Sequence, residues 1–247
     1  MRSPSRIPGS IPNPGRNPLS RHFILPPLMA GLALLFSASL LAQEQGDWLL
    51  RLGVVNFDPS DSRGVLRADS GTSLGGAAVS MDDNSQLGVT IGYMLTDSWA
   101  IEAEASASFK HEISINGLQA QGLTTTSLGD TYLVTPTLSA LYYFGPPRSN
   151  LRPYIGAGIN YTRFFQASVT NQTRSELGAR NLNLDDSVGL ALRAGLDWEL
   201  RNGWFINTSV SRIDMNTTVN FQTATDRFSG NKELNPWIYM FTLGHKF

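Results

Sequence analysis

The chain of 247 residues lacks cysteine altogether and is poor in charged residues. The missing cysteine excludes a disulfide scaffold, a thiolate metal site and a cysteine nucleophile. Charged residues make up only 16% of the chain, which together with 23 glycines argues against a coiled coil or a helical solenoid. A net charge of −1 provides no basic excess that would favour nucleic-acid binding. The hydrophobic share of 41% is too high for intrinsic disorder.

The first 42 residues are typical of a secretory signal. Residues 1–22 contain four arginines and no acid, an apolar stretch covers residues 23–41, and Ala42 precedes a polar run. We therefore predict that residues 1–42 are a signal peptide that is removed, and that residues 43–247 form the mature protein. Loss of the four arginines leaves 15 Lys and Arg against 20 Asp and Glu, a net charge of −5. An uncleaved membrane anchor is the alternative, since the apolar stretch is near the lower limit for spanning.

After residue 42 no apolar run is long enough for a transmembrane helix, and hydrophobic residues instead recur with a period of two. In residues 86–95, for example, Leu87, Val89 and Ile91 alternate with small or polar residues. This alternation is the signature of a β-strand, whose successive side chains point to opposite faces. The predicted strands are residues 48–57, 86–95, 99–110, 132–144, 152–164, 187–200, 204–214 and 234–247.

The length of these eight segments favours a membrane barrel. They are longer than the five or six residues usual in soluble sheets, and a tilted bilayer crossing needs about nine to eleven residues. Short links at residues 96–98, 145–151 and 201–203 alternate with long ones at 58–84, 111–131, 165–186 and 215–233, as in outer-membrane barrels. Only a helix or a closed barrel satisfies its own peptide groups in lipid. The sequence therefore predicts an all-β, eight-stranded antiparallel transmembrane barrel in the outer membrane of a Gram-negative bacterium.

Aromatic residues gather where strands end. Amphipathic rings settle at the headgroup level of a bilayer, so the pattern indicates a girdle at each interface with outer-membrane lipids. Phe109, Tyr161 and Tyr239 are assigned to the girdle at the extracellular end. The other members are Trp99, Tyr142, Trp198, Trp204 and Phe247 at the turn end, and Trp237 at the extracellular end. The alternative is a core of ordinary aromatics in a soluble β-domain. The last strand ends in Phe247, which resembles the address read by the outer-membrane insertion machinery.

Six charged residues share the predicted inward face: three cations, Arg51, Arg193 and Lys246, and three acids, Glu102, Glu104 and Asp197. Eight strands enclose only enough room for side chains or one small ligand. Two interpretations remain open. The charges either pair into a plug that blocks the lumen, or they form a polar constriction, Arg51 with Glu102 and Glu104, that opens for a substrate.

Catalytic or metal chemistry is not indicated. The predicted mature chain has two histidines, His111 and His245, which are far apart in sequence and form no ligand cluster. His111 with Ser114 or Ser127 is the remaining combination that resembles a lipid-modifying site. We therefore predict no enzyme, no cofactor and no metal.

One stretch of sequence resembles a known family. Residues 143–145, Tyr-Phe-Gly, followed by residues 152–162, Arg-Pro-Tyr-Ile-Gly-Ala-Gly-Ile-Asn-Tyr-Thr, are similar to the OmpW family of small outer-membrane barrels, and weaker matches extend over residues 48–247. The resemblance implies an eight-stranded barrel whose narrow interior admits small, mostly apolar molecules, which enter from the outside and leave sideways into the membrane. The chain departs from the family at Glu104 and Ser211, where apolar residues constrict the lumen, and at His245, where tyrosine is usual.

Two functions follow as expectations. The first is passive uptake of small, mostly hydrophobic molecules through the outer membrane. The second is a structural or adhesion and receptor barrel, with a plugged lumen and with binding through the long polar extracellular loops.

Overall fold

Eight antiparallel strands close into a barrel in the computed structural model, which describes residues 43–60, 64–71, 73–116 and 126–247. The ring closes where the last strand pairs with the first, with Leu49 opposite Lys246. This confirms the predicted fold class, whereas the predicted signal peptide lies outside the described residues. The barrel strands, in order around the ring, are β1 (Trp48–Asp58), β4 (Asn84–Met94), β5 (Trp99–Ser106), β8 (Thr137–Tyr143), β9 (Leu151–Val169), β11 (Ser187–Glu199), β12 (Trp204–Ile213) and β15 (Trp237–Lys246).

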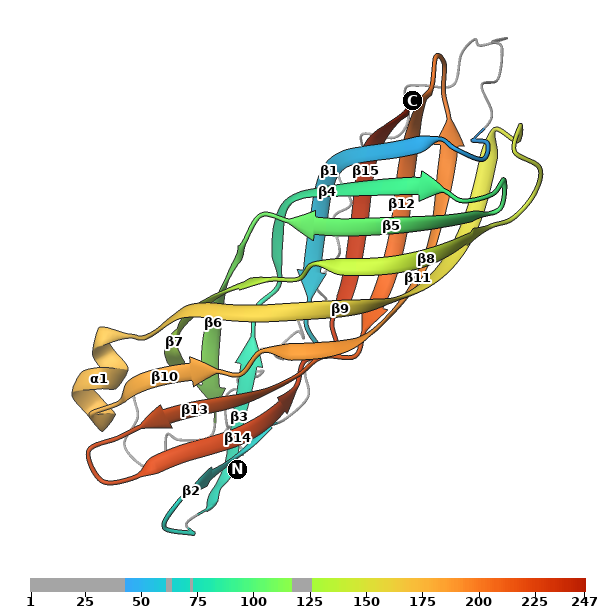
Figure 1. The fold of residues 1–247 in the computed structure, drawn as a ribbon. Coiled ribbons are helices and arrows are strands. Elements are labelled where there is room, and N and C mark those ends of the chain that lie inside the picture. Colours follow the sequence, from blue (N-terminus) through green and yellow to red (C-terminus); the bar gives the residue numbers. More distant parts are fainter. Residues whose placement is uncertain (1–42, 61–63, 72, 117–125) are drawn as a thin grey trace, which may run out of the picture. The chain divides into compact units, whose positions relative to one another are not determined.

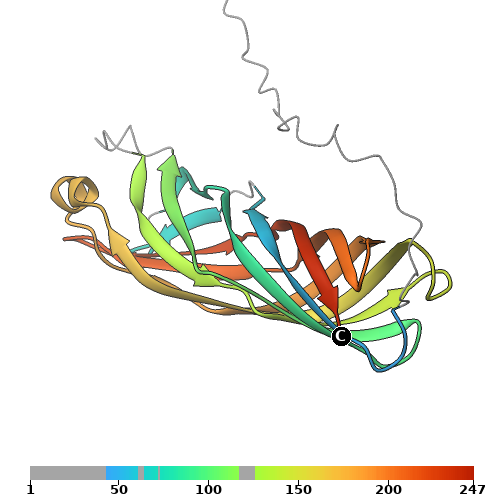
Figure 2. The same cartoon turned by 90° about the horizontal axis from the view of Figure 1, so that it is seen from above.

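The long links are not simple loops, because most of them continue the hairpins as a second antiparallel ladder. β9 belongs to both ladders, and α1 (Asn171–Leu177) follows it at the end of the molecule opposite the C-terminus (Figure 1, Figure 2). In these links the apolar residues are too sparse to show a clear period of two. Hydrogen bonding between neighbouring strands nevertheless orders the backbone of the links. The added strands are β2 (Gly64–Ala68), β3 (Ser73–Met81), β6 (Phe109–Asn116), β7 (Ser127–Val134), β10 (Arg180–Leu184), β13 (Asn216–Gln222) and β14 (Arg227–Glu233).

Two predicted strands are each broken in the structure. The segment 99–110 divides into β5 and β6 around residues 107–108, and the segment 132–144 divides into β7 and β8 around Thr135 and Pro136. Proline has no N–H to donate to a ladder, which explains the second break. The first break shifts the alternation by one residue. Phe109 is therefore buried inside and Lys110 is exposed outside, the reverse of the prediction from an unbroken strand.

The outer face of the barrel is a belt of exposed apolar side chains. Leu52, Leu87, Leu190 and Phe241, from four different strands, each expose more than half of their surface. A contiguous apolar surface of this kind marks a contact with another apolar phase, here the lipid chains of a bilayer. Of the predicted girdle residues, Phe109 is buried inside the barrel, so its assignment to the girdle was wrong, and Tyr142 is half-buried. The others are exposed, namely Trp99, Tyr161, Trp198, Trp204, Trp237, Tyr239 and Phe247.

The short links are tight turns at the C-terminal end of the barrel. Asn202 and Gly203 join β11 to β12 with φ of 56° and 80°, the pair of positive values that a two-residue hairpin turn requires. Figure 1 shows this turn at the same end as the C-terminus. Within the described residues, no helix combines the length and apolar character needed to cross a membrane.

Candidate functional site

Arg51 is the centre of a charged network inside the barrel. Its side chain is 1% exposed and ion-pairs with Glu102 and with Asp197, the latter at 3.0 Å. Its second terminal nitrogen also donates to the hydroxyl oxygen of Tyr143 at 2.7 Å. The strands β1, β5, β8 and β11 supply one residue each. The strand alternation therefore brings residues as distant as 51 and 197 together in the lumen.

Arg193 forms the second half of the network. Its guanidinium binds Glu102 Oε1 at 2.5 Å and ion-pairs with Glu104, while its Nε donates to Ser211 Oγ at 2.8 Å. Glu102 thus joins Arg51 to Arg193. The predicted constriction of Arg51 with both acids is corrected in one respect: Glu104 pairs with Arg193 and not with Arg51.

Lys246 is also inside, but it belongs to a separate pair. Its Nζ lies 2.8 Å from Glu199 Oε1. Residue 246 is near the end of β15 and residue 199 ends β11, so this pair lies at the C-terminal end of the lumen rather than in the network.

Several network residues were missed by the sequence reasoning. Asn207 donates to Asp197 Oδ1 at 2.6 Å and to the hydroxyl oxygen of Tyr154 at 3.0 Å, and the guanidinium of Arg152 lies 4.8 Å from the ring centre of Tyr143. The alternation of residues 152–164 already places Arg152 and Tyr154 on the same face as the inward glycines. This pattern could have predicted that Arg152 and Tyr154 point into the lumen.

Apolar side chains fill the lumen on both sides of the network. The inward residues of β1 show the order of these layers, starting at the end of the barrel where the C-terminus lies. Leu49 belongs to the smaller apolar cluster, Arg51 to the network, and Val55 and Phe57 to a second, larger apolar cluster. The smaller cluster contains Leu49, Met94, Ala100, Leu141, Tyr143, Tyr154 and Phe205. The larger cluster extends into the second ladder, so the half of the interior that contains β6 and β13 is mainly apolar.

Two inward glycines make room for the aromatics of the smaller cluster. A Cβ on Gly195 would collide with the ring of Tyr154, and one on Gly244 would collide with the ring of Phe205. The lumen is therefore narrowed at this level by aromatic rings that lie over the glycines paired with them on the neighbouring strands.

A groove on the outer surface coincides with a gap in the barrel wall. The β5–β8 ladder ends at Glu104 opposite Thr137, and the β6–β7 ladder starts at Phe109 opposite Leu133. The cavity at this gap has a volume of about 540 Å³, and we call it the lateral groove. It is lined by Val89, Ile91, Ala103, Glu104, Ala105, Pro136, Thr137, Leu138, Ile159 and Tyr161. Glu104 therefore contributes both to the groove and to the ion pair in the lumen.

His111 lies in the apolar interior of the second ladder, and its neighbours on β6, Lys110 and Glu112, are exposed. Its Nδ1 donates to the Asp82 carbonyl oxygen at 2.8 Å, so Nε2 is the unprotonated nitrogen, and Nε2 is buried with no hydrogen-bond partner among the described residues. The ring packs 5.0 Å from that of Phe57. The imidazole thus binds the backbone carbonyl of Asp82, and its Nδ1 lies 3.3 Å from Oδ1 of the same residue; the described contacts of the ring do not include Ser114 or Ser127.

We expect acid to destabilise the second ladder through His111. Burial lowers the pKa of His111 below 6.5, against smaller opposing effects of Asp82, so the unfolded ladder binds the proton more readily than the folded one. The stabilising contribution is then complete above pH 6.5 and is lost as the pH falls from there through the lowered pKa. The protection factors of the β6 amides, which are the intrinsic exchange rate at each pH divided by the observed rate, should fall in that range, and less so in His111→Phe. An equal fall of the protection factors in both proteins would contradict the prediction.

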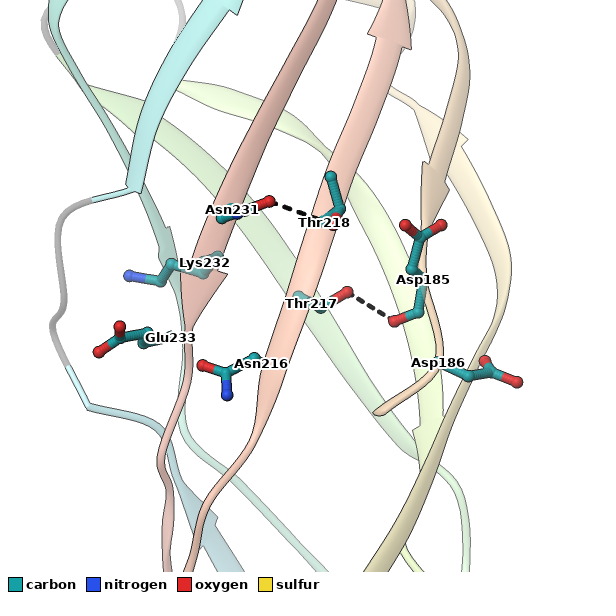
Figure 3. Close-up of a pocket in the computed structure, with 8 residues that line it drawn as sticks. All are labelled: Asp185, Asp186, Asn216, Thr217, Thr218, Asn231, Lys232 and Glu233. Atoms are coloured by element: carbon teal, nitrogen blue, oxygen red, sulfur yellow. Dashed lines mark hydrogen bonds between the residues drawn. The ribbon is translucent and has the colours of Figure 1, made fainter. Parts of the chain in front are cut away.

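A second pocket, of about 510 Å³, lies on the second ladder and is polar. Figure 3 shows its lining residues, with Thr217 donating to the Asp185 carbonyl oxygen at 2.7 Å and Thr218 to Asn231 Oδ1 at 3.3 Å. Asp186 turns away toward β9, where it accepts from Tyr161 at 2.6 Å. No group of three or more acidic or histidine side chains among the described residues is arranged to hold a metal ion.

His245 and the chain end lie on the outer surface. The His245 ring is 4.8 Å from that of Trp204 and 6.2 Å from that of Phe247. This histidine lies within a row of exposed aromatics and takes no part in the charged network.

The comparisons with known proteins agree with this architecture. The OmpW family model matches residues 44–247. Outer membrane protein W of Vibrio cholerae is 40% identical over 220 residues, which are 89% of this chain and 97% of that protein. The dibenzothiophene metabolism operon protein PahQ of Pseudomonas aeruginosa is 26% identical over 83% of this chain and 90% of its own length.

Among solved structures, the crystal structure of the outer membrane protein OprG from Pseudomonas aeruginosa superimposes with a TM-score of 0.77. It is 31% identical and covers 85% of this chain and 99% of its own. Outer membrane protein W and OprG are outer-membrane proteins, and OprG shares the barrel fold of this chain. We conclude that the chain belongs to the OmpW family and is an outer-membrane barrel protein of a Gram-negative bacterium.

Proposed function

We propose that this protein is a passive channel for small hydrophobic molecules, which enter the apolar interior of the second ladder and leave through the lateral groove into the membrane. The observation that carries the proposal is the position of the groove. It lies on the lipid-facing surface, at the one level where β5 and β8 stop pairing and β6 and β7 have not yet begun. A solute can cross a wall most easily where no backbone ladder holds it together.

The distribution of polarity in the lumen supports a sideways route. An apolar solute gains from the apolar cluster near Phe57 and Phe109, and it meets a barrier at Arg51 and Arg193, whose charges are buried and paired. Separating such ion pairs costs several kcal/mol, which an apolar solute cannot compensate. The groove opens beside Glu104, at the level of this barrier.

The chemistry named for one relative agrees with such a solute. PahQ is named for an operon of dibenzothiophene metabolism, and dibenzothiophene is a flat aromatic compound of low polarity. We infer a solute of similar size and polarity for this chain. We further propose that the strand ending in Phe247 is the segment that the outer-membrane insertion machinery recognises.

Filling the groove should block uptake. Ala103 is exposed on the groove wall, between Ile91 and Leu138 of the neighbouring strands. In Gram-negative cells that carry the protein in the outer membrane, Ala103→Trp should lower the uptake rate of dibenzothiophene roughly tenfold, a barrier increase of about 1.4 kcal/mol.

The matched control is Ala194→Trp, since Ala194 is exposed on β11, a strand that does not line the groove. It should leave uptake unchanged at an equal amount of folded protein. If cells with Ala103→Trp and cells with Ala194→Trp both take up the solute at the same rate as cells with the unmodified protein, the proposed lateral route is wrong. A receptor barrel with a plugged lumen would give no protein-dependent uptake in any of the three.

A further inference from the structure

The residues that precede β1 fold into the C-terminal end of the barrel. Gln43 is 1% exposed, whereas Glu44 and Gln45 are exposed. The backbone of this segment binds the link between β4 and β5: Gln45 N donates to Asp97 Oδ1 at 3.0 Å, and Gly46 N donates to the Met94 carbonyl oxygen at 2.9 Å. We call residues 43–46 the N-terminal cap.

The side chain of Gln43 enters the lumen and binds two charged residues there. Its amide Nε2 donates to Asp197 Oδ2 at 3.0 Å. Arg152 Nη1 donates to both oxygens of Gln43, the carbonyl oxygen at 2.9 Å and Oε1 at 3.2 Å. The other end of the Arg152 guanidinium donates to the Asp97 carbonyl oxygen at 2.6 Å. Gln43 is thus held on every polar atom of its side chain, which is unusual for a residue outside the strands.

These contacts extend the charged network toward the barrel mouth. Asp197 accepts from Gln43 and from Arg51 on the same oxygen, while Arg152 also lies over the ring of Tyr143. A continuous chain of polar contacts therefore runs from the cap through Asp197 and Arg51 to Glu102 and Arg193. The cap thus supplies hydrogen-bond partners to Asp197 and Arg152, two charged side chains near this end of the barrel.

We propose that Gln43 is the stopper of the barrel at the end where the short turns lie. Together with the ion pair of Arg51 with Asp197 and the smaller apolar cluster, it closes the axial route to water and ions. The lateral groove then remains as the exit for solutes. The proposal rests on the proposed function for its consequence, but its geometry is independent of the solute. If the predicted cleavage after Ala42 occurs, the stopper is the first residue of the mature chain, and it can be seated without a leader that continues beyond it.

The test is ion conductance of the mature protein in planar bilayers. Gln43→Gly removes the side chain that binds Asp197 and Arg152, so conductance should rise several-fold over the unmodified protein. The control is Gln45→Gly, whose exposed side chain lies outside the lumen, and it should conduct like the unmodified protein. Unchanged conductance in Gln43→Gly would overturn the proposal.

A second variant and a second measurement complete the test. Gln43→Asn keeps the amide on a shorter side chain and should conduct at an intermediate level; a value equal to that of Gln43→Gly would show that the amide contacts do not close the route. Mass spectrometry of the purified protein identifies the first residue of the mature chain. A chain that starts at another residue would contradict the statement that Gln43 is the N-terminal residue. Loss of uptake in Ala103→Trp tests the lateral route separately, because it does not depend on conductance.

Discussion

Replacing Arg51 with methionine is expected to lower the free energy of unfolding of the barrel by about 3–5 kcal/mol, because one partner of a buried ion network is removed. Arg51 is 1% exposed and neutralises two carboxylates, Glu102 and Asp197. Methionine keeps the unbranched apolar stem but ends short of the guanidinium carbon that lies 5.2 Å from the ring centre of Phe205, so this contact is lost together with the charge. Arg193 still pairs with Glu102, whereas Asp197 keeps only the neutral donors Gln43, Asn207 and Tyr143.

The measurement is urea unfolding of the barrel refolded in detergent, followed by tryptophan fluorescence. Arg148→Met is the matched control, since Arg148 is 78% exposed and lies 3.8 Å from Glu44. Exposed pairs contribute about 0–1 kcal/mol, so this control should unfold almost like the unmodified protein. Arg51→Lys should fall between the two, because it keeps the charge and loses the planar arrangement of donors. A loss below about 1 kcal/mol in Arg51→Met would contradict the view that this residue holds the network together.

Neutralising Glu104 is expected to raise the uptake of an apolar solute roughly tenfold, which corresponds to about 1.4 kcal/mol of barrier. Glu104 pairs with Arg193 in the lumen and lines the lateral groove. In Glu104→Gln the ion pair across this passage is replaced by a neutral contact, and a passing solute no longer has to separate two opposite charges. The remaining pair of Arg193 with Glu102 keeps the cation compensated, so the barrel should still fold.

The assay is dibenzothiophene uptake by cells with equal amounts of folded protein in the outer membrane. The control is Glu112→Gln, an exposed carboxylate on β6 that does not line the groove. It should leave uptake unchanged. Equal uptake by Glu104→Gln and the unmodified protein would give this carboxylate a purely structural role. It would also favour the interpretation of the network as a plug.

The structure contains features of both lumen hypotheses, the plug of paired charges and the polar constriction beside a passage. Arg51 with Glu102 and Asp197 is enclosed by neutral donors and aromatic rings, as expected for a plug. Arg193 with Glu104 reaches the groove, as expected for a constriction that borders a passage. The inward charges therefore divide by position into a closed part near the cap and a part that faces the proposed exit.

The closed barrel, its eight spans and the inward orientation of the six predicted lumen charges all follow from the sequence alone, whereas Lys110 lies on the opposite side from the prediction. Alternation with a period of two is a local property, and in a lipid-facing barrel one face must be apolar, so Leu87 and Arg193 reveal their orientations without any knowledge of neighbours. The tight turn at Asn202 and Gly203 is equally local, because only certain residues adopt positive φ at low cost.

The contacts between distant residues, by contrast, depend on how the strands pair in the folded barrel. The pairing of Glu104 with Arg193 depends on the register of strands that are far apart in the chain, and no local pattern encodes it. The break after β5 reverses the orientation of Phe109. The breaks after β5 and β7 together create the lateral groove from two segments that each looked continuous. Gln43 precedes the first strand and carries no periodic signal at all, so its place in the lumen follows from closure of the ring around it.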